Sequence, residues 1–269
     1  MNRVYDPTQK RLIYFGMKST KDFWDTHWDQ ADVKGQITSV HKTSFVYRIT
    51  KAYLPSGGRV LDGGCGLGQF VYAFDRWGYD AYGVDYAPDT VQAVKRAAPH
   101  LSVVEADVRA LPFEDNFFDG YWSFGVIEHF WDGYDDIVRE MKRVVRKGGY
   151  VFVTFPYMSP LRRFLARRGV YALRDSRQEK EMKDTFYQFA LDLNFVKQIF
   201  EQYGFVMKEC SFRDGVKGLK DEVGWIRPLL QPVYESHRAV ARIVRYFLDI
   251  FLRRWSGHIA VCVFCLEQK

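Results

Sequence analysis

The sequence predicts an α/β fold, in which helices cover both faces of a mostly parallel sheet. Short apolar runs alternate with helical segments between residues 58 and 156, which is the pattern of repeated strand–helix units. A glycine-rich turn joins the first apolar run to the next helix. The 269 residues, 47% hydrophobic and 27% charged, suffice for one large domain or two small ones and exclude a disordered chain or a collagen.

The first 54 residues are expected to form an N-terminal helical cap. Residues 19–30 have the features of a helix start, with Ser19 or Thr20 as the capping residue. Residues 38–54 follow as a second helix, which Pro55 and the glycines after it end.

Five strands and three helices are expected between residues 58 and 156. The strands are short and rich in apolar residues, and they are placed at 58–64, 80–85, 101–107, 117–126 and 150–156. The helices that connect them are placed at 67–77, 89–98 and 132–147. Gly148 and Gly149 are the expected end signal of the last of these helices.

The regular alternation stops after residue 156, and two insertions are expected in the domain of residues 55–269. The first insertion, 157–184, is polar and arginine-rich and has no strand signal. The second insertion, 213–254, begins with a segment containing three glycines, which favours a loop. The complete expectation for this part is a helix at 185–203, a strand at 205–212, a loop at 213–231, a helix at 232–254 and a strand at 257–268.

The charge is distributed unevenly along the chain. The net charge is +6, but residues 57–155 carry −5, while the segments before and after them carry +4 and +7. This distribution excludes a uniform nucleic-acid-binding surface and indicates an acidic core with basic additions. Cys262 and Cys265 stand alone in an apolar run without zinc-binding spacing, so no metal site is predicted.

The chain is expected to be cytoplasmic. Its first 16 residues contain no apolar stretch followed by a small-residue cleavage site. No run of 18 or more uncharged apolar residues occurs, so no membrane-spanning helix is expected.

The strongest functional motif is V-L-D-G-G-C-G-L-G at residues 60–68. Asp62 ends a strand, and Gly64, Gly66 and Gly68 let the backbone turn tightly and approach a ligand before a helix begins. A dinucleotide fingerprint requires a further glycine or alanine at Gln69 or Val71, and neither position has one. A phosphate-binding P-loop is also excluded, because no Gly-Lys-Ser/Thr follows.

Two acidic residues end the next two strands. Asp85, in G-V-D-Y, is placed to accept hydrogen bonds from both hydroxyls of a ribose. Asp107 is placed to accept a hydrogen bond from the exocyclic amine of adenine, and the backbone N–H of Val108 is a donor beside it. Together these residues predict an adenosine-containing ligand.

The same segments resemble the successive motifs of class I S-adenosylmethionine-dependent methyltransferases, of the small-molecule type found in ubiquinone, menaquinone and glycan-cluster biosynthesis. The segments are D-G-G-C-G-L-G, G-V-D-Y, E-A-D-V-R-A-L-P-F, F-F-D-G-Y-W-S-F-G-V-I-E-H-F and V-R-K-G-G-Y-V-F-V-T-F-P, within residues 55–156. The resemblance implies a doubly wound, Rossmann-like sheet of seven strands with the last strand antiparallel. Gly63 departs from the family pattern, where a larger apolar residue is common, and is expected only to loosen packing.

The resemblance also implies the cofactor, S-adenosyl-L-methionine, and the residues that bind it. The three motif glycines would surround the methionine moiety, Asp85 would bind the ribose, and Asp107 and Val108 the adenine. Residues of the same motifs complete the predicted cofactor site: Asp62, Tyr86 and Ser123.

The segment Phe23-Trp24-Asp25 with Trp28 is similar to the F/Y-W-D-x-x-W segment that begins many small-molecule members of this family. There an N-terminal helix covers the cofactor pocket. The alternative is an aromatic stripe that packs on the core. The candidates for substrate or cap residues are Trp24, His27, Trp28, His41 and Tyr157.

Methyl transfer from a sulfonium is an in-line displacement, in which the protein mainly positions the two reacting atoms. A general base is needed only if the acceptor atom starts protonated. His129, in I-E-H-F after the fourth strand, is the candidate base, and the alternative is a structural histidine. Glu128 beside it is interpreted as structural.

A small-molecule acceptor, such as a lipid, a quinone or a glycan precursor, is expected for O-, N- or C-methylation. DNA is disfavoured, because S-F-G-V at 123–126 replaces the N/D-P-P-Y/F/W motif of enzymes that methylate amines of bases. The alternatives are an RNA methyltransferase, a non-catalytic scaffold that binds the cofactor and an NAD-dependent oxidoreductase.

Two basic amphipathic segments, 159–170 and 238–254, lie in the insertions. Arginines alternate with apolar residues in both of them, a pattern that suits peripheral contact with an anionic membrane. A lid over the acceptor and a homodimer interface are the alternatives.

Overall fold

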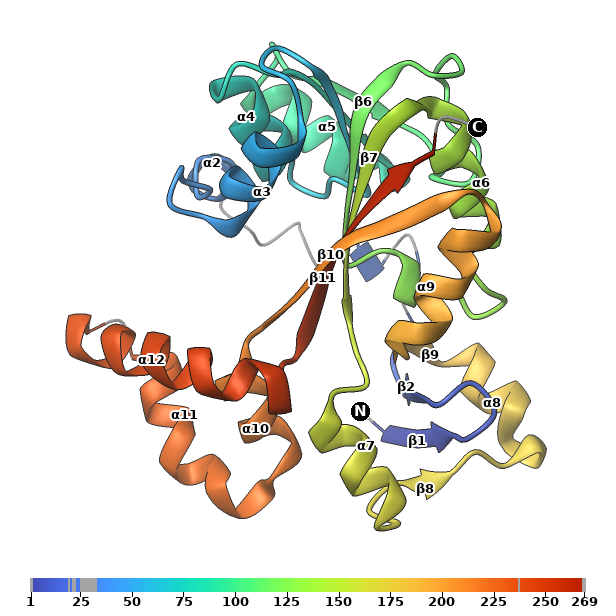
Figure 1. Cartoon of the computed structure of the whole chain (residues 1–269), viewed down its shortest axis with the longest axis vertical. Helices are drawn as coiled ribbons and strands as arrows, with labels where there is room; N and C mark the ends of the chain where they lie inside the picture. Colours follow the sequence, from blue (N-terminus) through green and yellow to red (C-terminus); the bar gives the residue numbers. More distant parts are fainter. Residues whose placement is uncertain (1, 19, 21–22, 25–32, 237, 268–269) are drawn as a thin grey trace.

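The computed structural model describes residues 2–18, 20, 23–24, 33–236 and 238–267. The described residues form two β-sheets, one of seven strands and one of four. Figure 1 shows the seven-stranded central sheet between its helices and the small sheet at one end of the molecule. The predicted fold class is confirmed.

The central sheet has the strand order β10-β11-β7-β6-β3-β4-β5. Its strands from β5 to β7 are parallel, whereas β11 pairs antiparallel with both β7 and β10. The last strand is therefore antiparallel, as expected. The strands are β3 (Arg59–Gly63), β4 (Asp80–Asp85), β5 (Ser102–Glu105), β6 (Phe118–Phe124), β7 (Val145–Pro156), β10 (Phe205–Arg213) and β11 (Ile259–Leu266).

Both faces of the central sheet are buried, because its strands carry apolar residues at consecutive positions. Trp122 and Phe152 belong to the core under one group of helices, α2 (Val33–Ile37), α3 (Phe45–Tyr53), α4 (Gln69–Arg76) and α5 (Pro88–Ala97). Tyr121 and Val151, one position earlier in each strand, belong to the core under α6 (Asp135–Val144) and α9 (Leu193–Gln202).

The small sheet has the order β8-β1-β2-β9 and joins the N-terminus to the first insertion. Strands β1 (Asn2–Asp6) and β2 (Arg11–Phe15) form an antiparallel hairpin, and β9 (Phe186–Ala190) pairs with β2. The short strand β8 (Ala172–Leu173) pairs with β1. The prediction of a purely helical segment 1–54 is therefore wrong for residues 2–15, and a helix at 185–203 is wrong for residues 186–190.

Local side-chain bonds explain both differences. The Asp6 carboxylate accepts hydrogen bonds from the backbone N–H groups of Thr8 and Gln9, which closes the hairpin turn. The Asp192 carboxylate accepts the backbone N–H of Asn194 at 2.9 Å and caps α9, so the helix begins only at Leu193.

The first insertion also contains helices that the sequence did not indicate. These are α7 (Pro160–Arg167) and α8 (Glu179–Asp184), with the short 3-10 segment η2 (Ser176–Gln178) before α8. Ser159 caps α7 by accepting the backbone N–H of Arg162, and Pro160 occupies the first helical turn.

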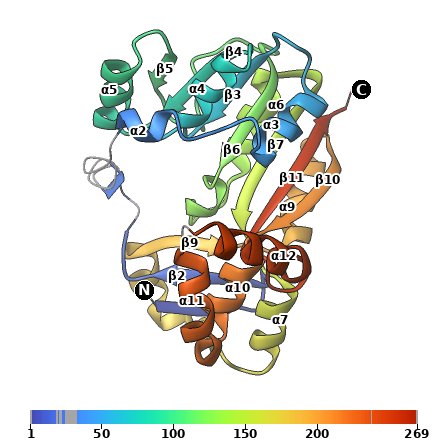
Figure 2. The same cartoon turned by 90° about the vertical axis from the view of Figure 1, so that its left-hand side faces the viewer.

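The second insertion is helical throughout most of its length, so the predicted loop at 213–231 is wrong. It contains α10 (Gly215–Glu222), η3 (Gly224–Ile226), α11 (Arg227–Glu235) and α12 (Ala239–Ser256). Gly215 and Gly218 allow close packing of two helices: a side chain at either position would overlap with the backbone of α12 near Arg253 or Ser256. Figure 2 shows these helices at the same end of the molecule as the small sheet.

Gly63, the departure from the family pattern, has a specific packing reason. A Cβ at this position would overlap with the Oη and Cζ atoms of Tyr121. Tyr121 is fully buried, so its ring has no free space into which it could move. The expectation that Gly63 only loosens packing is wrong, because the tyrosine fills the space that a larger residue would occupy.

We predict that Gly63→Ala lowers the free energy of unfolding by about 1–3 kcal/mol, since it overpacks the core. Gly224→Ala is the matched control, because no atom lies within 4 Å of its Cβ position. Urea unfolding of both variants measures the difference. Equal changes in the two variants would contradict the packing argument.

Candidate functional site

A cavity of about 370 Å³, here called the first cavity, lies where β3, β4 and β6 end at their carboxyl ends. Ligands of open α/β folds bind at this edge of the sheet. The cavity is lined by Trp24, Gly64, Gly66, Asp85, Tyr86, Ala106, Asp107, Val108, Arg109, Phe124, Gly125, Val126, His129 and Phe130.

The glycine motif forms the turn at one side of the first cavity. Gly64, Gly66 and Gly68 have φ angles of 82°, 49° and 71°, in the left-handed region that side chains rarely adopt. Gly64 and Gly66 line the cavity, whereas Gly68 lies behind them at the start of α4. The turn therefore presents bare backbone to a ligand.

Asp85 is fixed in place by backbone donors. One of its carboxylate oxygens accepts the Gly66 N–H at 2.8 Å, and the other accepts the Ala87 N–H at 3.0 Å. The side chain thus ties the glycine turn to the end of β4. Its carboxylate lines the first cavity in this fixed orientation.

Asp107 forms a two-point ion pair with Arg109, whose Nε and Nη2 lie 3.0 and 2.6 Å from its carboxylate oxygens. These hydrogen bonds lower the pKa of Asp107, so the carboxylate is charged at neutral pH. Val108 and Tyr86 line the same cavity. Four of the predicted cofactor residues thus come together with Gly64 and Gly66.

Asp62 and Ser123 do not line the cavity. Both are buried, and their side-chain oxygens have no hydrogen-bond partner among the described residues. Burial and the charge of Asp85 raise the pKa of Asp62 well above its ordinary value. Both residues lie in the strands beneath the site.

His129 lines the first cavity as a neutral imidazole. Its Nδ1 donates to the backbone carbonyl of Tyr187 at 2.6 Å, which leaves Nε2 as an acceptor. Burial lowers the pKa of His129 to about 4. The edge of its ring meets Trp24, with 5.2 Å between ring centroids. Trp24 is therefore part of the cavity, as predicted from the N-terminal motif.

The other candidates lie elsewhere. His41 is exposed and Tyr157 is buried against Phe212, with 4.6 Å between the rings, and neither lines the cavity. His27 and Trp28 lie outside the described residues.

A second cavity of about 430 Å³ adjoins the first, because Gly125 lines both. Its walls come from the small sheet, from α7 and α10, and from the adjacent ends of β7 and β11. The lining residues are Arg3, Tyr14, Gly125, Glu128, Thr154, Phe155, Pro156, Arg162, Tyr187, Gln188, Lys217, Asp221, Glu222, His258 and Ile259. Most of these residues were not predicted from the sequence, in which the arginine-rich segment that contains Arg162 was the only signal.

Glu128 belongs to η1 (Ile127–His129) and lies in the wall of the second cavity. It is 2% exposed, and its Oε2 has no hydrogen-bond partner among the described residues. Burial raises the pKa of this carboxyl to about 8. Glu128, interpreted from sequence as structural, is thus a buried acid with a free oxygen beside the two cavities.

Comparisons with known proteins agree with this geometry. Residues 61–153 match the family described as "Methyltransferase domain". Over 97 residues the chain is 35% identical to a probable S-adenosylmethionine-dependent methyltransferase of Mycobacterium tuberculosis, a match that covers 36% of this chain and 35% of that protein. It is 38% identical over 101 residues to the demethylmenaquinone methyltransferase of Roseiflexus castenholzii. This match covers 36% of this chain and 42% of that protein.

The fold has close counterparts among solved structures. The PH0226 protein of Pyrococcus horikoshii superposes with a TM-score of 0.58 at 17% identity, covering 93% of this chain and 100% of that chain. The sequence matches, in contrast, span only about a third of the M. tuberculosis relative. The matching region, residues 61–153, is an S-adenosylmethionine-dependent methyltransferase domain and contains most of the first cavity.

We predict that the raised pKa of Glu128 makes stability depend on pH. The pKa of Glu128 is about 8 in the folded protein, above the ordinary 4.5. The contribution of this carboxyl to the free energy of unfolding is therefore complete below pH 4.5 and is lost as the pH rises through 8. In Glu128→Gln this loss disappears, so the variant gains on the order of a few kcal/mol relative to wild type between pH 5 and pH 8.

Urea unfolding at both pH values measures this difference, and exposed Glu114→Gln is the control. The nearby histidines are present in all three proteins, so the comparison isolates Glu128. Parallel pH profiles for wild type and Glu128→Gln would contradict the prediction.

Proposed function

We propose that this chain, which carries a class I S-adenosylmethionine-dependent methyltransferase domain, transfers the methyl group of that cofactor to a small-molecule acceptor. The observation that carries the proposal is the first cavity, where a glycine turn with bare backbone meets the fixed carboxylate of Asp85 and the carboxylate of Asp107. A cavity of this size and composition is typical of small-molecule and cofactor sites.

The residues present fit the cofactor. Asp85 would accept hydrogen bonds from the ribose hydroxyls, since its carboxylate is held in place by backbone donors and lines the cavity. Asp107, oriented by Arg109, would accept the adenine amine, and Val108 would offer its backbone N–H. Gly64 and Gly66 would lie against the methionine moiety, since they line the cavity without side chains.

The bound cofactor supplies a methyl group activated by a positively charged sulfur. The protein has to hold the acceptor atom in line with that methyl group and exclude water. Transfer would form a bond from the acceptor atom to the methyl carbon and break the carbon–sulfur bond, with its electron pair left on sulfur. A proton released from the acceptor then needs a base.

Two residues between the cavities are candidates for that base. His129 has a free Nε2, but its pKa of about 4 makes it a weak base at neutral pH. Ionised Glu128, with a pKa of about 8, matches a neutral operating pH better and has an unpaired oxygen. We therefore assign Glu128 the role of base and His129 a positioning role.

The other functions weighed from the sequence have less support. The name of the R. castenholzii relative indicates a quinone acceptor. A quinone is apolar, whereas the lining of the second cavity has three cationic side chains, Arg3, Arg162 and Lys217. An RNA acceptor requires a basic stripe on an open surface, whereas these cations line a cavity. A scaffold without activity would leave the unpaired acid at Glu128 without a role.

We predict that Asp85→Ala weakens the binding of S-adenosylhomocysteine by about tenfold to a hundredfold, because charge-assisted hydrogen bonds are lost. Titration calorimetry measures the affinity. Asp80→Ala is the control, since Asp80 lies at the opposite, exposed end of β4. Unchanged binding by Asp85→Ala would remove the ribose assignment.

We also propose that α12 contacts an anionic membrane surface. None of the described helices is long and apolar enough to cross a membrane. The outer face of α12 nevertheless carries a row of exposed apolar side chains, Val240, Ile243, Val244, Phe247, Ile250, Phe251 and Trp255. Phe251 is 79% exposed. Such a row is unusual on the surface of a soluble monomer.

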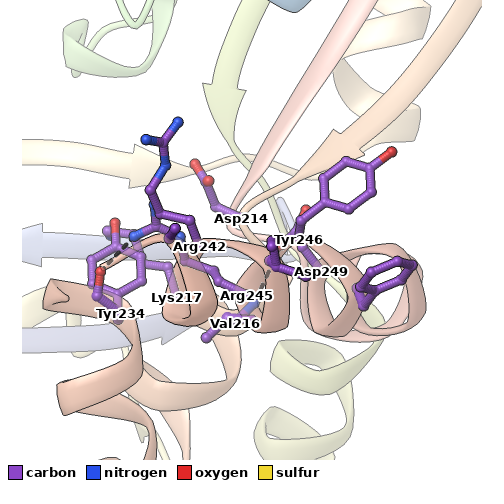
Figure 3. Close-up of a pocket in the computed structure, with 11 residues that line it drawn as sticks. Asp214, Val216, Lys217, Tyr234, Arg242, Arg245, Tyr246 and Asp249 are labelled. Carbon is purple, nitrogen blue, oxygen red and sulfur yellow. Dashed lines mark hydrogen bonds between the residues drawn. The ribbon is translucent and has the colours of Figure 1, made fainter. Parts of the chain in front are cut away.

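The charges of α12 favour anionic lipid as the occupant. Arg254 is exposed and lies on the same face as the apolar row, one helical turn after Ile250 and Phe251. The only acidic residue of the helix, Asp249, accepts the backbone N–H groups of Gly215 and Val216 and so faces α10 (Figure 3). The outer face is thus apolar and positively charged, which is the pattern of helices that lie in a membrane interface.

We predict that the double substitution Phe247→Ser/Phe251→Ser reduces binding to phosphatidylglycerol-containing vesicles by about tenfold or more, since it removes two large apolar groups from the interface. Vesicle flotation measures binding, with pure phosphatidylcholine vesicles as the lipid control. Leu173→Ser, at a 66% exposed apolar residue of β8, is the protein control. Equal flotation of all variants would reject the membrane, and a dimer that dissociates in the double variant would show that α12 pairs with a second copy.

A further inference from the structure

The second cavity has more positive than negative charge. Arg3 and Arg162 share a single carboxylate, Glu222, at 2.7 Å each. Lys217 pairs with Asp221 at 3.1 Å, but Asp221 also accepts Lys220 at 2.8 Å. Glu128 has a pKa of about 8 and is mostly protonated at neutral pH. In the cavity lining, the charged carboxylates of Asp221 and Glu222 therefore face three cationic side chains, Arg3, Arg162 and Lys217.

The excess of positive charge is concentrated around His258. Its Nδ1 lies 3.0 Å from Nη2 of Arg162, and its Nε2 lies 2.8 Å from Nζ of Lys217. Burial and the neighbouring cations lower the pKa of His258 well below its ordinary value, so the ring is neutral. A neutral imidazole has one acceptor nitrogen and one N–H. One of the two contacts must therefore bring two donors together.

An anion in the cavity would resolve this conflict, because it could accept hydrogen bonds from the Lys217 ammonium and from the imidazole N–H. Lys217 is partly exposed, and it can turn one of its three N–H groups to a ligand without leaving Asp221. Arg162 is fixed by three bonds, from Nε to Glu222, from Nη1 to the Tyr157 carbonyl and from Nη2 toward His258. The rigid guanidinium and the adjustable ammonium thus form one electropositive wall.

Part of the lining of the second cavity adjoins the first cavity. Gly125, which lines both, donates its N–H to Thr154, and Thr154 lines the second cavity. The carboxyl group of Glu128 also belongs to this part of the lining, since a Cβ on Gly125 would lie 3.3 Å from its Oε1, and its Oε2 has no hydrogen-bond partner among the described residues. A ligand that spans the cavity therefore has one end near the transfer point and the other against cations.

We propose that the second cavity binds the methyl acceptor and that this acceptor carries an anionic group, a carboxylate or a phosphate, against Lys217, Arg162 and His258. The acceptor atom lies at the Gly125 end, toward the first cavity. This inference rests on the proposed methyltransferase function and adds the chemical class of the substrate. The volume of about 430 Å³ suits a small molecule rather than a macromolecule.

The test uses inorganic phosphate and benzoate as anionic probes and benzamide as the neutral counterpart of benzoate. Each probe is titrated into the full-length protein that is saturated with S-adenosylhomocysteine, at low ionic strength. We expect phosphate and benzoate, but not benzamide, to bind. In Lys217→Gln the affinity for both anions falls at least tenfold, because a charge-assisted hydrogen bond is lost.

Two further variants separate charge from structure. Lys217→Arg keeps the charge and retains binding. Lys197→Gln removes a lysine from a comparable i,i+4 pair with Glu201 on α9, far from the cavity lining, and leaves binding unchanged. Equal binding of benzoate and benzamide, or full anion binding by Lys217→Gln, overturns the inference.

The same titrations distinguish this inference from the proposed function. Failure of S-adenosylhomocysteine to bind the wild-type protein overturns the methyltransferase function and this inference with it. Binding of S-adenosylhomocysteine without binding of either anion overturns only the anionic acceptor.

Discussion

The second cavity of this protein depends on one buried carboxylate. Glu222 of α10 accepts hydrogen bonds from Arg3 of β1, from Arg162 of α7 and from the hydroxyl of Tyr171, each at 2.7 Å. These donors come from the N-terminal hairpin and the first insertion, so one side chain joins three additions that are far apart in sequence. A buried carboxylate that loses its hydrogen-bond partners destabilises the fold by several kcal/mol. In this protein three donors offset the desolvation of Glu222. The wall of the second cavity exists only where these bonds form.

The two cavities differ in how locally they are encoded. The first is built from turns that directly follow β3, β4 and β6, where a glycine or an aspartate acts through its own backbone neighbourhood, as Asp85 does with Gly66. The second requires Arg3, Lys217 and His258 to meet across more than 200 residues. The first cavity can therefore stay the same while substitutions in the N-terminal hairpin and the two insertions change the lining of the second cavity.

This difference also explains what could be predicted from the sequence. The parallel strands, the glycine turn and the carboxylates at strand ends follow local periodicity and spacing, and their positions were predicted to within a few residues. The hairpin of residues 2–15 was missed because a short polar turn between two apolar runs gives a weak signal. Gly215 and Gly218 suggested a loop, yet they permit contact between α10 and α12, and only the packed structure reveals that purpose.

Glu128 and His129 place two neutral groups between the cavities. Burial raises the pKa of the carboxyl to about 8 and lowers that of the imidazole to about 4, so neither carries much charge at neutral pH. Such a neutral wall would separate a positively charged cofactor in the first cavity from the proposed anionic acceptor in the second without forming an ion pair with either one. A cation beside Glu128 lowers the pKa of its carboxyl, and an anion raises it. Because the pKa of Glu128 is already close to neutrality, a positive charge held in the neighbouring first cavity would favour its ionised form, in which this carboxylate could act as the proposed base.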